Sequence, residues 1–350
     1  MVFTSINSQS ELPAHGGDLD RAITQYGGQM TDWLDLSTGI SPWPYPPPDV
    51  EVTLWQRLPP APNTLCQAAA RYYGCEEHYV VVSPGSQLAI RLLPTLLPKP
   101  TTVAIPLIGY QEHGYAWRLA GHQTLHYRGL AELNALIATE QVEHAVVINP
   151  NNPTTDYFST TALADLAQTL RGILLVDEAF ADTTTASMVE YLDTNENLMI
   201  LRSPGKFFGL AGARVGFLLS RNQLADQLKT LLMPWSLSAP ACHVVESALR
   251  DSNWQSMQKQ RIQQAGQKMV QLLSGVVKRR QPDLELRPQA LFCSLFGSKE
   301  SLHVLHQSLA ERKIWTRLNA PQEPVSWLRI GLPGPAQSRF EAALDSVIKQ

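Results

Sequence analysis

The alternation of short apolar runs with helical patterns is the feature that most constrains how this chain can fold. The apolar runs are rich in β-branched residues, and helical segments separate them. Strands joined by helical crossovers pair in parallel, and the helices then cover both faces of the sheet. The sequence therefore predicts an α/β fold with a largely parallel sheet. The runs lie at residues 79–82, 102–105, 144–148, 172–176, 198–201 and 215–219.

The length of the chain and its change of pattern indicate more than one domain. With 350 residues, the chain is long for a single core. After Asn222 the pattern becomes mainly helical, and the last part adds strand-like runs at 291–296 and 325–330. Prolines between 42 and 48 exclude regular helix there. We expect an N-terminal arm over 1–45 that packs with the small domain, a large domain over 46–245 and a small α+β domain over 246–350.

The composition excludes several classes of protein. The net charge is −3 without a basic block, so nucleic acid is not expected as a partner. The sequence contains no apolar run long enough to span a bilayer, and its start lacks the pattern of a signal peptide. We therefore expect a cytoplasmic protein without membrane contact. The cysteines lack the spacing of metal ligands, so we expect free thiols and no metal site. The four cysteines are Cys66, Cys75, Cys242 and Cys293.

Polar residues follow several of the predicted strands at the point where each strand ends. A turn with Ser86 and Gln87 follows the run at 79–82, and Asn152 follows the run at 144–148. Asp177 and Lys206 come after two later runs. Ligands of parallel sheets bind outside the carboxyl ends of the strands. The convergence of these residues therefore predicts a ligand site.

The segment around Lys206 is the strongest single candidate for chemistry. Residues 201–217 are apolar and glycine-rich and contain no acidic side chain. Burial favours the neutral form of a lysine, and a neutral amine can form a Schiff base with a carbonyl. Ser203 and Arg214 flank the lysine and can bind an anion, the arginine through its planar fork. From this segment alone, a surface loop with a solvated lysine stays an open alternative.

These groups together meet the needs of pyridoxal 5′-phosphate (PLP). The lysine holds the aldehyde, Asp177 keeps the pyridine nitrogen protonated, and the ring becomes an electron sink. A serine–glycine turn at the start of a helix binds the phosphate, and Tyr110 stacks on the ring. Nucleotide sites are excluded, because Gly205-Lys206 lacks the P-loop spacing and no G-x-G-x-x-G motif follows a strand. Arg329 in a strand indicates either a bound anion or an exposed strand edge.

Over nearly its whole length, the chain resembles the fold-type I PLP-dependent enzymes of the class I/II aminotransferase family. The motifs are Asn152-Pro153-Thr154, Asp177-Glu178-Ala179-Phe180 and Ser203-x-x-Lys206, with Arg214 eight residues beyond the lysine. Within that superfamily it is most similar to the threonine-phosphate decarboxylases of cobalamin biosynthesis, relatives of histidinol-phosphate aminotransferase. The features that indicate this are His15-Gly16-Gly17, the segment 34–42, Met233-Pro234-Trp235-Ser236, and Phe180 where many aminotransferases have tyrosine.

The resemblance implies a mostly parallel seven-stranded sheet, a homodimer and a role for particular residues. Lys206 would carry PLP, and Asp177 would pair with its pyridinium; both would be catalytic. Asn152 would bond the ring hydroxyl. The other cofactor-binding residues implied are Ser86, Gln87, Tyr110, Ser203 and Arg214. The substrate-binding residues implied are His15, Gly39 and Arg329, the last for a carboxylate.

Three positions depart from the family's pattern. Gly39 stands where related enzymes often have an asparagine that contacts substrate. Leu58 stands where they often have a tyrosine that reaches the phosphate of the neighbouring subunit, and Gly205 replaces a hydroxyl residue before the lysine. These departures concern substrate choice and phosphate binding, and they leave the cofactor assignment intact.

The activity implied is the decarboxylation of L-threonine O-3-phosphate to (R)-1-amino-2-propanol O-2-phosphate and CO2 in cobalamin biosynthesis. A first alternative is an aminotransferase acting on histidinol phosphate or another amino acid. A second is a regulatory protein that binds PLP without catalysis, and retention of both Lys206 and Asp177 disfavours it. The first alternative needs the same cofactor site, so the sequence leaves it open.

Overall fold

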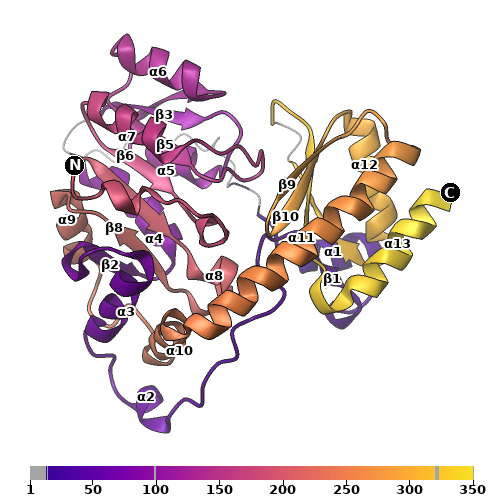
Figure 1. The fold of residues 1–350 in the computed structure, drawn as a ribbon, viewed down its shortest axis with the longest axis horizontal. Helices are drawn as coiled ribbons and strands as arrows, with labels where there is room; N and C mark the ends of the chain where they lie inside the picture. Colours follow the sequence, from indigo (N-terminus) through magenta and orange to yellow (C-terminus); the bar gives the residue numbers. More distant parts are fainter. Residues whose placement is uncertain (1–12, 14, 98–99, 320–322, 350) are drawn as a thin grey trace, which may run out of the picture.

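The protein has a large lobe built around one sheet and a smaller lobe with a sheet of its own (Figure 1). The structure, a computed structural model, describes residues 13, 15–97, 100–319 and 323–349. Within them, the large sheet has seven strands in the order β2-β8-β7-β6-β5-β3-β4. The strands are β2 (Val80–Ser83), β3 (Thr102–Pro106), β4 (Gln123–Tyr127), β5 (His144–Ile148), β6 (Leu174–Asp177), β7 (Leu198–Arg202) and β8 (Gly216–Leu219).

The large sheet is mostly parallel, as the sequence predicted. The pairs β3–β4, β3–β5, β5–β6 and β6–β7 are parallel, whereas β8 runs antiparallel to both β2 and β7. The strand β4 was not predicted from the sequence, because its segment Gln-Thr-Leu-His-Tyr is largely polar. This strand lies at the sheet edge, where partial exposure permits polar residues.

Helices cover both faces of the large sheet because successive strand residues point to opposite sides. Val146 packs with the helices of one face, whereas Ala145 and Val147 pack with those of the other. The first face carries α4 (Ser86–Leu92), α5 (Glu112–Leu119) and α9 (Gln223–Leu231). The second face carries α3 (Asn63–Tyr73), α6 (Leu130–Ala138), α7 (Thr160–Thr169) and α10 (Ala239–Arg250).

The small lobe contains an antiparallel sheet in the order β12-β13-β10-β9. Its two central strands were predicted from the sequence, whereas its two edge strands, which are short or partly exposed, were not. These four are β9 (Glu285–Gln289), β10 (Phe292–Phe296), β12 (Arg317–Leu318) and β13 (Trp327–Gly331). The helices of this lobe are α11 (Ser252–Arg280), α12 (Lys299–Ala310) and α13 (Gln337–Lys349).

The N-terminal segment contacts both lobes. After α1 (Leu19–Tyr26), strand β1 (Leu34–Asp35) pairs in parallel with β11 (Ile314–Trp315) of the small lobe. The chain then crosses to the large lobe, where the Ser41 N–H donates to the Lys206 carbonyl at 2.9 Å. The start of the predicted arm, residues 1–12 and 14, lies outside the described residues. The domain boundaries at 45 and 245 stay predictions.

The helix α11 extends from the large lobe into the small lobe (Figure 1). Its buried Gln258 Nε2 donates to Ser41 Oγ at 2.7 Å and to the Phe207 carbonyl at 3.2 Å. The same amide donates to the Trp43 carbonyl at 3.0 Å. One side chain of α11 therefore joins the N-terminal segment to the residue that follows Lys206. Among the described helices, none combines the length and apolar character needed to cross a bilayer.

Candidate active site

The predicted site residues meet at a cavity of about 540 Å³ beside the carboxyl ends of the central strands. Asp177 ends β6, Ser203 follows β7, and Asn152 follows β5. The cavity is thus located where the topology of a parallel sheet places a ligand. Its lining includes nine predicted residues, namely His15, Ser86, Gln87, Tyr110, Asn152, Asp177, Ser203, Lys206 and Arg214.

A second cavity of about 260 Å³ adjoins the first and contains the remaining predicted residues, Gly39 and Arg329. Lys206 and Asn152 line both cavities. The two cavities therefore form one continuous site between the lobes, and every residue predicted for the site borders it.

Lys206 lies on the short helix α8 (Pro204–Phe207) and is partly buried. Burial lowers the pKa of its amine to about 8, and the charges of Arg329 and Arg214 act in the same direction, against Asp177. Near neutral pH a useful fraction of the amine is therefore unprotonated and nucleophilic.

The glycine that precedes the lysine is required by close packing. A Cβ on Gly205 would lie 2.8 Å from the Cα of Ala211. The family's hydroxyl residue cannot be accommodated here without moving backbone, which explains this departure in physical terms.

Asp177 is buried and its carboxylate is held by two neighbours. Oδ1 accepts the Ala179 N–H at 3.0 Å, and Oδ2 lies 2.9 Å from His113 Nε2. His113 is fully buried in α5, and its Nδ1 lacks a hydrogen-bond partner within the described part of the chain. His113 was not predicted as a site residue, because it lies within α5, seven residues beyond the end of β3, where no local pattern marks it.

A polar cup lies at one end of the larger cavity. Ser86 Oγ and Ser203 Oγ are 2.8 Å apart, and both side chains border the cavity. Gly85 has φ +75°, and a Cβ there would lie 2.8 Å from Arg214 Nη2. The guanidinium therefore approaches the turn closely only because residue 85 is glycine. Two hydroxyls and one guanidinium form a cup suited to a phosphate.

Tyr110 and Gln87 are bonded to each other. The Tyr110 hydroxyl donates to Gln87 Oε1 at 2.6 Å, and burial raises the pKa of the phenol. The tyrosine therefore stays protonated and fixed at the wall of the cavity, where its ring can stack on a bound aromatic group.

Arg329 is buried in β13, an interior strand of the small sheet, so the exposed-edge alternative is wrong. Its Nη1 donates to Asn152 Oδ1 at 2.6 Å, and its Nη2 donates to the Ser37 carbonyl. Burial and the charge of Arg317 lower the pKa of Arg329 to about 10, so it stays charged at neutral pH. Asn152, predicted to bond the cofactor's hydroxyl, links the two lobes through this arginine.

Arg317 is a further candidate, which was not predicted from the sequence. It lies directly opposite Arg329 in the pairing of β12 with β13 and borders the same cavity. Glu323 borders this cavity as well and accepts from Trp327 Nε1 at 2.7 Å. The strand β12 has only two residues, too short for a recognisable pattern, so the sequence carried no signal for this pair.

His15 docks the N-terminal segment against the large lobe at the mouth of the cavity. Its Nε2 lies 2.9 Å from Oε1 of the buried Glu112, which also pairs with Arg91. The glycine after it is packed against the chain, because a Cβ on Gly16 would lie 2.3 Å from the Ser37 carbonyl oxygen. The acidic partner of His15 was not predicted, since Glu112 is remote from it in sequence.

The residues present fit PLP. Lys206 offers an amine of lowered pKa, Asp177 a buried and oriented carboxylate, and the cup of Ser86, Ser203 and Arg214 an anion site. The cavity of about 540 Å³ accommodates a ring and a phosphate of this size. Within the described residues, no cluster of three or more histidine, cysteine or acidic side chains is placed to bind a metal.

Fold and site together define a fold-type I PLP-dependent enzyme. The chain belongs to the aminotransferase class I and II family, whose model matches residues 55–347. It is 40% identical to the threonine-phosphate decarboxylase of Pseudomonas aeruginosa over 94% of this chain and 96% of that one.

Two solved structures support the fold. A histidinol-phosphate aminotransferase from Sinorhizobium meliloti, in complex with PLP, matches with a TM-score of 0.79 and 22% identity, over 99% of this chain and 98% of that one. An L-threonine-O-3-phosphate decarboxylase from Porphyromonas gingivalis matches with a TM-score of 0.74 and 18% identity, over 90% and 99%. At these identities the likeness establishes a shared fold.

Proposed function

We propose that the protein is a PLP-dependent decarboxylase that converts L-threonine O-3-phosphate to (R)-1-amino-2-propanol O-2-phosphate and CO2. The proposal is supported by the relative in Pseudomonas aeruginosa, which covers nearly the whole chain. The place of this reaction would be cobalamin biosynthesis, in keeping with the name of that relative, and we expect the enzyme to act in the cytoplasm.

The observation that carries the proposal is the pair of arginines beside Lys206. Arg329 and Arg317 face each other on neighbouring strands and border the same cavity as the lysine. A substrate with a carboxylate and a phosphate has two anionic groups, and guanidinium groups suit both. We assign Arg329 to the carboxylate and Arg317, beside Glu323, to the phosphate.

Bound PLP would supply an electron sink for the pair of electrons released at the substrate carbon. Lys206 would hold the cofactor and place its amine beside the reacting carbon. Asp177, held by His113, would keep the pyridine nitrogen protonated. Arg329 would hold the carboxylate until the bond between it and Cα breaks. After CO2 has left, the carbon would take up one proton, and the Lys206 ammonium is the group positioned to donate it.

An aminotransferase would use the same cofactor residues and differ in which bond at Cα is aligned. The experiment that separates the two incubates the purified, PLP-loaded protein with L-threonine O-3-phosphate and measures CO2, amine and keto acid together. Equal amounts of CO2 and amine support the decarboxylase. Keto acid without CO2 would identify an aminotransferase, and no reaction with bound PLP would favour the regulatory alternative.

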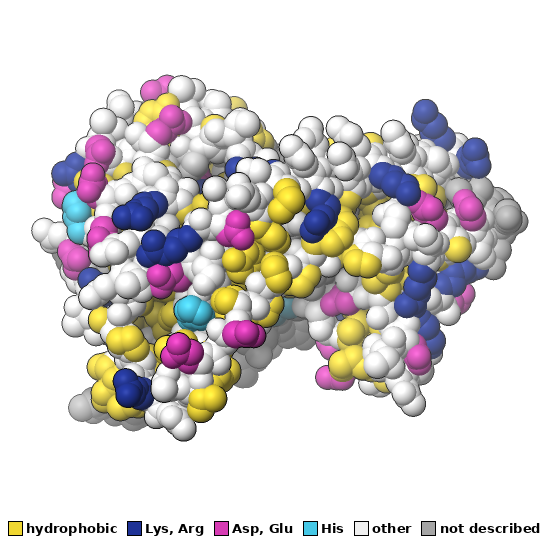
Figure 2. All heavy atoms as spheres, turned by 60° about the horizontal axis from the view of Figure 1, so that its bottom comes forward, with side chains coloured by type: hydrophobic (Ala, Val, Ile, Leu, Met, Phe, Trp, Pro, Cys, Tyr) yellow, Lys and Arg dark blue, Asp and Glu magenta, His cyan; other side chains and the backbone are white. Residues whose placement is uncertain are grey.

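We also propose a homodimer, on the basis of exposed apolar side chains around α2 (Val52–Gln56). The face of the molecule that carries this helix shows many hydrophobic side chains (Figure 2). Trp55 and Leu58 are 68% and 67% exposed, an unusual degree for such residues near one another. Leu58, the departure noted above, would then contact the partner chain through apolar surface. Light scattering of the wild type and of Trp55→Glu tests this: the wild type should be dimeric and the variant shifted towards monomer.

A further inference from the structure

The space beside Gly39 is filled by the ring of Phe180. A Cβ on residue 39 would lie 2.7 Å from Phe180 Cε1 and 2.9 Å from its Cζ. A Cβ does not approach another carbon that closely. The two positions are therefore coupled: the ring can occupy its place only while residue 39 has no side chain.

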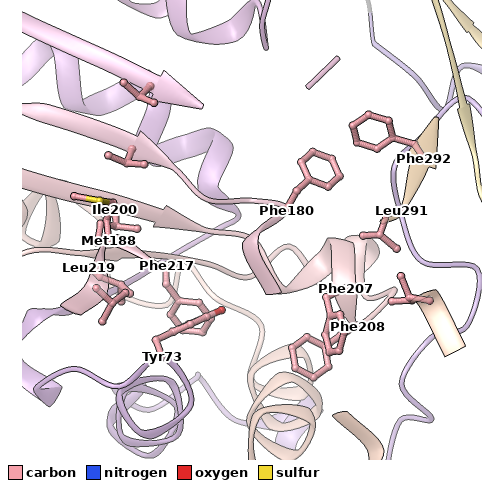
Figure 3. Close-up of a cluster of buried hydrophobic side chains, with 14 of the residues drawn as sticks. Tyr73, Phe180, Met188, Ile200, Phe207, Phe208, Phe217, Leu219, Leu291 and Phe292 are labelled. Carbon is pink, nitrogen blue, oxygen red and sulfur yellow. The ribbon is translucent and has the colours of Figure 1, made fainter. Parts of the chain in front are cut away.

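Both lobes fix this ring in position. Phe180 follows β6 of the large lobe, and its ring faces that of Phe292, which lies on β10 of the small lobe (Figure 3). The ring centroids are 5.2 Å apart at 76°, and both side chains are buried. An edge-to-face pair of this kind is favourable and resists rotation of either ring.

The Phe180 ring also stands next to the catalytic lysine. Lys206 Nζ lies 5.8 Å from the ring centroid, and both residues line the larger cavity. An aromatic ring offers no exchangeable proton and excludes water from its surface. The Tyr110 hydroxyl, on another part of the wall, is committed to Gln87. Lys206 is therefore the proton donor best placed to serve the reacting carbon.

We propose that Phe180 is a specificity-determining residue that reserves the proton of Lys206 for Cα of the substrate. The proposal rests on the proposed decarboxylase function. When the bond from Cα to the carboxylate breaks, CO2 leaves, and one proton added at Cα gives the amine product. If that proton adds to the cofactor instead, one water molecule releases an aldehyde, the nitrogen remains on the cofactor, and turnover stops.

The variant Phe180→Tyr tests this directly, because it adds one hydroxyl at Cζ, a ring carbon 2.9 Å from the position of a Cβ on residue 39. The measurement is the number of amine molecules formed per aldehyde released, followed until the enzyme stops. We expect this ratio to fall about tenfold. This corresponds to a change of about 1.4 kcal/mol in the difference between the barriers to protonation at Cα and at the cofactor. A fall of less than about threefold overturns the proposal. If the variant fails to fold, Phe180→Leu takes its place, since loss of the ring admits water.

A matched control is Phe296→Tyr. Phe296 is buried on the same strand as Phe292, but its ring borders a separate cavity of about 320 Å³, which has room for a hydroxyl. The ratio of amine to aldehyde in Phe296→Tyr should equal that of the wild type. An equal fall of this ratio in Phe180→Tyr and Phe296→Tyr overturns the proposal. If the wild type releases no CO2, the proposed function fails and this inference with it; CO2 with an unchanged ratio in Phe180→Tyr refutes the inference alone.

A second readout needs neither PLP nor substrate. In the apoprotein, Gly39→Ala should lower the thermal midpoint because its methyl group collides with the Phe180 ring. Phe180→Leu introduced together with Gly39→Ala should recover part of that loss, since the smaller side chain clears the space. Strictly additive effects of the two substitutions would show that the ring does not depend on Gly39, and the proposal would then be abandoned.

Discussion

Arg202 bridges the ends of β6 and β7 through two buried carboxylates. Its Nη1 donates to Glu178 Oε2 at 2.6 Å and its Nη2 to Asp182 Oδ1 at 2.9 Å. Burial opposes the charge on the guanidinium, but Asp182 and Glu178 offset this and raise the pKa of Arg202. The bridge adjoins two residues of the candidate site, because Glu178 follows Asp177 and Arg202 precedes Ser203.

Removing that arginine should be strongly destabilising. Arg202→Leu leaves Glu178 and Asp182 buried without their cation, and we expect a loss of about 3–5 kcal/mol in the free energy of unfolding. Urea denaturation of the apoprotein measures it. The control is Arg171→Leu, which breaks the exposed pair with Glu140 and should change stability by at most about 1 kcal/mol. Similar losses in both variants would contradict the bridge.

The lowered pKa of Lys206 makes cofactor capture depend on pH. Only the neutral amine attacks the aldehyde, so the rate at which apoprotein binds PLP covalently should rise with pH. Burial lowers the pKa to about 8 from a usual 10.5, so the midpoint of the rise should lie near 8. Stopped-flow absorbance over pH 6–11 records it. A midpoint near 10.5 would mean that the lysine is solvated.

The same shift affects stability, with a definite sign. Between about pH 8 and 10.5 the folded protein binds fewer protons at Lys206 than the unfolded chain. The cost of burying the ammonium is therefore complete below pH 8 and disappears as pH rises to 10.5. Lys206→Met should stabilise the apoprotein at pH 7, and its advantage should shrink over that window. An advantage that does not change with pH would have another cause.

Asp177→Asn should fold but lose at least about a hundredfold in kcat, or about 3 kcal/mol of barrier. Asparagine cannot stabilise a protonated pyridine nitrogen as a carboxylate does. Steady-state kinetics with PLP occupancy measured by absorbance provide the check. Near-normal turnover at full occupancy would refute the proposed role.

His113 should act only through Asp177. His113→Phe removes the contact at 2.9 Å and leaves the carboxylate less well oriented, so we expect about a tenfold loss in kcat. In a double-mutant cycle with Asp177→Asn, the second substitution should add little to the first. Fully additive losses would assign His113 a role of its own.

Arg329→Lys keeps the positive charge but loses the planar fork. We expect kcat/KM for threonine phosphate to fall by about tenfold or more, on the order of 1.4 kcal/mol, with PLP affinity little changed. Kinetics beside a PLP titration decide the matter. Unchanged kinetics would place Arg329 outside the substrate site, whereas loss of PLP binding alone would assign it to the cofactor.

The cofactor side of the site was predictable because its signals are local in the sequence. Asp177, Ser203 and Lys206 each come at or just after an apolar run, and the end of a parallel strand is where a ligand lies. The apolar runs themselves revealed the central strands. The edge strand β2 was also predicted from its apolar run. The edge strands β4 and β9 were missed, since they are partly exposed and contain polar residues that no run of apolar side chains marks.

The other parts of the site could not be predicted in the same way because tertiary contacts create them. Arg317 faces Arg329 only through the register of a two-residue strand, and His113 meets Asp177 only through the packing of α5 on the sheet. The meeting of Gly39 with Phe180 likewise depends on the path of the N-terminal segment across the large lobe. None of these pairs is close in sequence or has a spacing that indicates contact.

The helix α11 has a mechanical consequence. Its 29 residues form a rod about 43 Å long. Near one end, the Gln258 side chain donates a hydrogen bond to the carbonyl of Phe207, one residue beyond Lys206. The other end lies in the lobe that contains Arg329. Because α11 joins the two, we expect any rotation of that lobe to move the segment beside the lysine as well. Binding of a carboxylate at Arg329 and alignment of the reactive amine would then be coupled.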